Sequence, residues 1–145
     1  MKLRCLSFSL IFIIGIFILT GCGGRVYDLP DDPIVFKSGE FNPSNDDGYV
    51  TVECNGKAYI MYGEIKSKGL LSDLSYAFGE CLGYVEDDDA HRIYALAGES
   101  TEEWLIEYYC VGLMDPPPIV LREISAKGSD NIPDCVKPFG YDYWK

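Results

Sequence analysis

The chain has few of the residues that enzymes and metal sites commonly use. It has one histidine, His91, and its six cysteines form no C-x-x-C pair. Structural zinc sites combine closely spaced cysteines with histidines, so a zinc site is not expected. There is no G-x-S-x-G motif, and no residue near His91 in the sequence would serve as its nucleophile. We therefore predict no catalytic residue, no metal and no cofactor, and we expect His91 to be a surface residue.

Basic residues are also scarce. The chain has 12 lysines and arginines against 23 aspartates and glutamates, a formal net charge of −11. An acidic excess of this size repels nucleic acid, which is excluded as a partner. The acidic run Glu86–Asp89 predicts a solvated loop. Its spacing does not fit an EF-hand, because Arg92 stands where that motif needs glycine, and cation binding by the loop stays open.

The chain has a single long apolar run, and it lies at the N-terminus. Lys2 and Arg4 precede an almost unbroken apolar stretch, Leu6–Leu19, and small residues follow it at Gly21 and Cys22. A basic start, an apolar centre and small residues are the three parts of a secretory signal. The apolar run is shorter than the roughly 20 residues that a membrane-spanning helix needs. The pattern predicts an export signal, not a permanent spanning helix.

The stretch Leu19-Thr20-Gly21-Cys22 resembles the lipobox of bacterial lipoproteins at all four positions. The resemblance implies that residues 1–21 are cleaved as a lipoprotein signal peptide and that the Cys22 thiol carries a diacylglycerol. Residues 22–33 would then be a lipidated, flexible tether and residues 34–145 a single β-rich domain. The lipobox resemblance also implies that the protein lies on the extracytoplasmic face of a bacterial membrane. The alternative is an ordinary signal peptide cut nearby, with Cys22 unmodified.

Cysteine usage agrees with export. Cys5 lies in the signal segment and Cys22 at its end, which leaves an even number of cysteines in a small exported domain. We predict that these four form two disulfides, with three pairings open: Cys54, Cys81, Cys110 and Cys135.

The clearest structural signal is a β-hairpin. Two runs rich in β-formers, Tyr49–Cys54 and Lys57–Tyr62, flank Asn55-Gly56. Both central residues of a type I′ turn need positive φ, so Asn-Gly between such runs favours a two-residue hairpin. The turn predicts two apolar pairs on one face: Val52 with Tyr59, and Val50 with Met61.

Further short strands are predicted at close spacing along the chain. The segment 63–79 stays ambiguous, and the chain after Ser125 looks irregular. Helix and strand are both open for residues 104–111, but the aromatic and β-branched composition favours a strand. Together these runs predict a mainly β fold, a small antiparallel barrel or sandwich of about five or six strands stapled by disulfides. The expected strands are Ile34–Phe36, Glu80–Val85, Arg92–Ala97, Trp104–Val111 and Ile119–Ile124.

Aromatic residues supply the main indication of function. All eleven tyrosines and both tryptophans follow the signal segment, and aromatic surfaces suit recognition of glycans or proteins. The part after Cys22 loosely resembles small lipoproteins of Gram-positive bacteria in the stretches AYIMYGEIK, ECLGYVEDDD, RIYALAG and WLIEYYCVG, a resemblance that implies no activity. The candidate ligand-binding residues are Tyr108, Tyr109, Tyr141, Tyr143 and Trp144.

Three classes of function remain open. The first is a non-enzymatic, membrane-anchored module that binds an envelope protein, a peptide or a glycan. The second is an acidic inhibitor of a basic secreted enzyme such as lysozyme, which the charge, small size and anchor would suit. The third is an envelope hydrolase that uses a pair of carboxylates.

Overall fold

The computed structural model describes residues 29–43, 48–69, 73–111 and 116–145. These residues confirm a mainly β fold. The described part contains eight strands and three short 3₁₀ helices, and none of its helices is long and apolar enough to span a membrane. The strands are β1 Ile34–Phe41, β2 Tyr49–Cys54, β3 Lys57–Ile65, β4 Phe78–Val85, β5 Asp88–Leu96, β6 Trp104–Tyr109, β7 Ile119–Glu123 and β8 Val136–Pro138. The helices are η1 Ser75–Ala77, η2 Ile124–Ala126 and η3 Asp142–Trp144.

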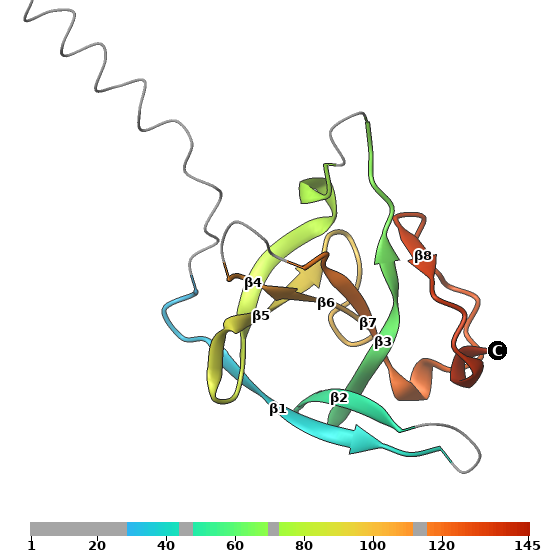
Figure 1. The fold of residues 1–145 in the computed structure, drawn as a ribbon, viewed down its shortest axis with the longest axis horizontal. Helices are drawn as coiled ribbons and strands as arrows, with labels where there is room; N and C mark the ends of the chain where they lie inside the picture. The colour runs from blue at the N-terminus through green and yellow to red at the C-terminus, as the bar shows by residue number, and fades with distance from the viewer. Residues whose placement is uncertain (1–28, 44–47, 70–72, 112–115) are drawn as a thin grey trace, which may run out of the picture.

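Seven of these strands close into a barrel (Figure 1). Their order is β2-β1-β4-β5-β6-β7-β3, and pairing between β2 and β3 closes the ring, while β8 adds to one edge of β3. The structure thus selects the barrel over the sandwich. The sheet is mixed and not purely antiparallel, because β1 runs parallel to β4, and the described residues hold more strands than the five or six expected.

The barrel core is formed by one buried apolar side chain from each strand of the ring. Side chains from strands on opposite sides of a closed ring can meet only inside it, so this cluster is the interior of the barrel. Its members are at most 4% exposed. They are Phe36, Val52, Tyr59, Val85, Ile93, Leu105 and Leu121.

A second apolar layer lies on the outer face of β3, β5, β6 and β7. Neighbouring residues of a strand point to opposite faces, so Tyr94 and Ile106 point outward next to the inward-facing Ile93 and Leu105. Val136 of β8, Ala77 of η1 and the C-terminal Trp144 pack against this face. These strands are therefore buried on both faces, which explains their almost continuous apolar sequences.

The predicted hairpin is confirmed at its turn and is wrong beyond it. Asn55 and Gly56 have φ values of 50° and 77°, and Val52 pairs with Tyr59 as expected. The β2–β3 ladder stops there, so Val50 does not pair with Met61. The C-terminal segment takes over the edge of β3 instead, and Val50 pairs with β1.

The remaining strand predictions hold, with changed boundaries. Residues 104–109 form a strand, as their composition favours, and the predicted loop Glu86–Asp89 shrinks to a two-residue turn because β5 begins at Asp88. β1 extends five residues beyond the predicted Phe36. The chain after Ser125 was expected to be irregular, but it supplies β8 and η3.

Gly83 allows β1 to approach β4 closely enough to close the ring. A Cβ at Gly83 would lie 1.8 Å from the backbone carbonyl oxygen of Ile34. We expect Gly83→Ala to lower the free energy of unfolding by about 1–3 kcal/mol, since the backbone must shift. Chemical denaturation measures this. The control is Gly48→Ala, whose Cβ would meet only the exposed side chain of Asn42, which can rotate away. Equal losses in the two variants would contradict the close approach.

Candidate functional site

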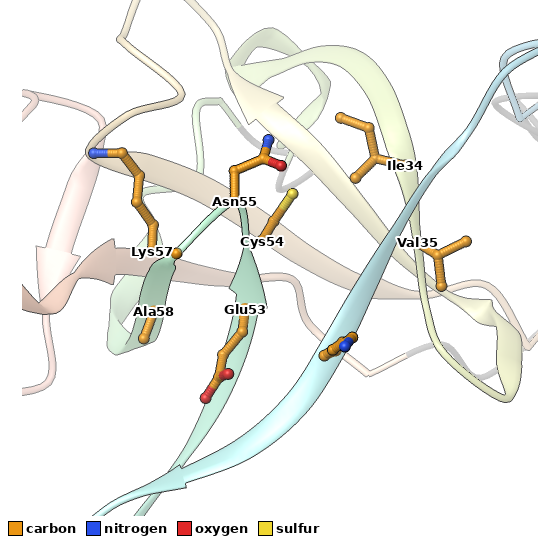
Figure 2. A pocket seen from close by; sticks show the side chains of 9 residues that line it. Ile34, Val35, Glu53, Cys54, Asn55, Lys57 and Ala58 are labelled. Atoms are coloured by element: carbon orange, nitrogen blue, oxygen red, sulfur yellow. The ribbon is translucent and has the colours of Figure 1, made fainter.

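One hollow on the described surface is a cleft between β1 and the β2–β3 hairpin (Figure 2). It has a volume of about 640 Å³. It opens where β1 leaves β2 to pair with β4. The Cys54 thiol and the Ile34 side chain lie on its two facing walls, and Asn55 stands at the hairpin end.

A smaller hollow of about 240 Å³ continues the cleft at the end of the barrel. The two share Ile34, Cys54, Asn55 and Lys57. Phe36, Tyr59 and Leu105 also line the smaller hollow and belong to the barrel core, so they form an apolar floor. Mouths of β-barrels are common ligand sites, and this one combines an apolar floor with a polar rim.

Two contacts hold the hairpin wall of the cleft in place. The Lys57 ammonium forms an ion pair with the Glu102 carboxylate at 2.9 Å, and this hydrogen bond raises the pKa of Lys57. The Tyr59 hydroxyl donates to the Thr101 carbonyl oxygen at 2.9 Å. Burial, followed by the nearby charges of Glu102 and Glu123, raises the pKa of Tyr59 to about 12. The phenol therefore stays protonated and keeps donating at neutral pH.

A second candidate site is an aromatic groove at the other end of β2. It forms where β2 and β3 separate, and it has a volume of about 410 Å³. Tyr49 and Tyr141 contribute rings 6.0 Å apart in an edge-to-face arrangement, and Val50 is 63% exposed. The lining is Gly48, Tyr49, Val50, Met61, Gly140, Tyr141 and Asp142.

The C-terminal segment builds one wall of this groove. Trp144 donates from its indole Nε1 to the Met61 carbonyl oxygen at 3.0 Å, and its ring packs against Tyr62. Tyr143 donates to the Ile124 carbonyl oxygen at 2.7 Å and packs edge-to-face on Phe41. These two side chains anchor the segment, and Tyr141 is left 37% exposed beside the groove.

The five predicted ligand-binding residues do not form one surface. Tyr141 lines the groove, whereas Tyr143 and Trp144 are tied down as anchors. Tyr108 and Tyr109 lie on β6 and, as neighbours in a strand, point to opposite faces of the sheet. Tyr108 packs against Phe78, and Tyr109 stacks on His91. The aromatic pattern alone could not separate a binding ring from a packing ring.

His91 is not the surface residue that we expected. Its Nε2 hydrogen-bonds the Glu107 carboxylate, and the two side chains are only 12% and 15% exposed. The ring also stacks on Tyr109 with centroids 4.1 Å apart. Glu107 is 16 residues away in sequence and comes close only through the β5–β6 register. The pair lies near the start of β5, away from the β5–β6 loop whose Thr101 and Glu102 line the smaller hollow.

The structure shows none of the predicted disulfides. Cys54, Cys81, Cys110 and Cys135 all carry free thiols. Cys54 packs against the barrel core, whereas Cys81 and Cys135 pack against the outer layer.

The position of Tyr94 explains why Cys81 and Cys110 stay apart. Tyr94 of β5 pairs with Cys81 on β4. Its hydroxyl lies 3.7 Å from the Sγ of Cys110, the residue that follows β6 in the chain. Two strand spacings of about 4.8 Å separate Cys81 from Cys110, more than the Cα separation of about 7 Å that a disulfide tolerates. Burial raises the pKa of Cys81, which favours the unreactive thiol.

We expect iodoacetamide to label all four thiols in unreduced, denatured protein. Peptide mapping by mass spectrometry should find Cys54, Cys81, Cys110 and Cys135 each alkylated, with no gain in labelling after reduction. A thiol that becomes reactive only after reduction would contradict the free thiols of the structure.

The acidic run Glu86–Asp89 forms an ordered hairpin tip. All four side chains are exposed. The Glu86 carboxylate accepts from the Ser38 backbone N–H, and the Asp88 carboxylate accepts from that of Ala90. In the part of the chain that the structure describes, no three His, Cys, Asp or Glu side chains gather in a way that could hold a metal ion.

The geometry thus offers two hollows, the cleft at the Cys54 end of β2 and the aromatic groove at its Tyr49 end. The segment Leu19-Thr20-Gly21-Cys22, which carries the lipoprotein resemblance, lies outside the described residues. Comparison with protein-family models, with curated proteins and with solved structures finds no match to this chain.

Proposed function

We propose that this chain is a lipid-anchored, non-enzymatic binding module on the outer side of a bacterial membrane, and that it binds a neutral glycan in the aromatic groove. The observation that carries the proposal is the exposed tyrosine wall of the groove. Tyr141 is 37% exposed and borders a hollow of about 410 Å³, so a ligand can reach it.

The chemistry of the groove favours a sugar. The apolar face of a sugar ring packs on tyrosine, and its hydroxyls need hydrogen-bond acceptors nearby. Asp142 supplies a carboxylate, whose pKa is lowered by the hydrogen bond from Lys145, so it stays ionised. Asp142 is the only charged side chain among the described residues that line the groove, and its ion pair with Lys145 balances its charge, which favours a neutral glycan. A peptide or a protein loop is the alternative ligand.

The anchor part of the proposal rests on the lipobox resemblance at Cys22. The tether 22–33 has about a dozen residues and a typical reach of roughly 18–20 Å, enough to hold the domain 34–145 clear of the lipid surface. Two or more acyl chains at Cys22 would give stable attachment, because each buried methylene contributes about 0.8 kcal/mol.

Labelled palmitate tests the anchor. We expect the wild-type chain to incorporate the label and to fractionate with membranes, and Cys22→Ala to lose both properties. Cys5→Ala serves as the control, since Cys5 lies in the segment that is removed. Continued labelling of Cys22→Ala would rule out this lipidation site.

A glycan array tests the binding site. We expect the full chain to bind a subset of neutral glycans and Tyr141→Ala to bind them roughly tenfold more weakly, because an aromatic contact contributes about 0.5–1.5 kcal/mol. The control is Tyr108→Ala, which removes a tyrosine outside the groove. Both variants should keep the near-ultraviolet circular dichroism of a folded barrel. Loss of binding in both, or in neither, would place the ligand elsewhere.

A further inference from the structure

The cleft contains a free strand edge on β1. Residues Lys37–Phe41 pair with β2, and Ile34–Phe36 pair with β4 on the opposite edge. β2 turns away after Cys54, so no described strand pairs with the β2-side edge of residues 34–36. The ring of strands therefore has a gap beside residues 34–36, where another strand could pair with β1.

The backbone of Val35 faces this open position. The carbonyl oxygen of Phe36 accepts from the N–H of Glu86 at 2.8 Å, so the polar groups of Phe36 point toward β4. Polar backbone groups of successive strand residues point to opposite edges, so the N–H and C=O of Val35 point into the cleft. Pro33, just before, has no N–H to offer, which limits this free edge to a short stretch.

The walls and rim of the cleft match the chemistry of a peptide. The floor of the adjoining hollow is apolar at Phe36 and Leu105. The rim carries charges of both signs that cancel, Lys37 beside Glu53 and Lys57 beside Glu102. A peptide main chain has no net charge and offers the donor and acceptor that Val35 lacks, whereas a nucleic acid would meet the acidic field of the whole chain.

We propose that the cleft binds an extended peptide segment of another protein, which pairs as a short strand with Val35 and places one apolar side chain against Leu105. This site is separate from the aromatic groove, so it does not depend on the proposed glycan. Strand addition takes its affinity from main-chain hydrogen bonds and its selectivity from the pocket for the inserted side chain.

The thiol of Cys54 reports occupancy of the cleft directly. The probe is the tightest-binding uncharged decapeptide selected from a display library against the full chain in a nonionic detergent. We expect saturating peptide to slow iodoacetamide alkylation of Cys54 at least about fivefold. Cys135, which packs on the outer layer, is the internal control and should react at an unchanged rate.

Two variants separate strand addition from simple apolar binding. Val35→Pro removes the free N–H without disturbing the pairing to β4, and it should weaken the peptide about fivefold, the effect of one main-chain hydrogen bond. Val35→Ala keeps the N–H and should bind within twofold of wild type. A probe with N-methyl groups on its backbone should not protect Cys54. Unchanged melting temperatures would show that both variants are folded.

Several outcomes would overturn the proposal. Failure of every library peptide to protect Cys54 would exclude a peptide site. Equal binding by Val35→Pro, or full protection by the N-methylated probe, would exclude strand pairing. Protection that rises with protein concentration alone would identify a second copy of this chain as the occupant.

Discussion

A buried guanidinium, that of Arg122 on β7, holds the outer layer of this protein onto the barrel. The residue is 3% exposed, and its Nε and one terminal nitrogen donate to a single carboxylate oxygen of Glu103 at 3.0 and 2.6 Å. The ring faces of Trp104 and Trp144 lie 4.6 and 5.5 Å from its central carbon. A charge this deeply buried is tolerated only when it is paired and fully hydrogen-bonded, so its partners are held in place as a unit.

Each candidate site forms at one end of β2, where two strands that pair along the rest of their length separate. At its Tyr49 end, β2 separates from β3 because the C-terminal segment occupies the edge of β3, and this separation opens the aromatic groove. At its Cys54 end, β2 turns back while β1 continues to β4, and this divergence opens the cleft. A regular barrel with β2 paired along its full length would have neither hollow. The irregular pairing of β2 is therefore the feature that creates both candidate binding sites, the cleft and the aromatic groove.

Local sequence patterns predicted most of the strands, but they did not predict how the strands pair or which side chains meet across them. The Asn55-Gly56 turn and the β-rich runs follow from backbone preferences that act over a few residues, so they could be read from the sequence. The parallel β1–β4 pairing, the His91–Glu107 contact and the separation of Val50 from Met61 depend on tertiary register. Cysteine number predicted disulfides, but pairing depends on distances that β-strand spacing sets. Among the aromatic candidates, only burial separates Tyr141 from its neighbours.

Amide hydrogen exchange tests most directly whether Arg122, through Trp144, holds the C-terminal part of the outer layer, which forms the groove wall, onto the barrel. Protection typical of a strand amide is expected at Phe139, whose N–H donates to the Tyr62 carbonyl oxygen at 3.0 Å. In Arg122→Met, we expect the peptide covering residues 137–145 to exchange at least about tenfold faster while β6 stays protected, because the cation–π contact of Arg122 with Trp144 is lost. Arg92→Met, which replaces an arginine outside this cluster, should leave exchange unchanged. Equal protection of residues 137–145 in Arg122→Met and wild type would contradict the account.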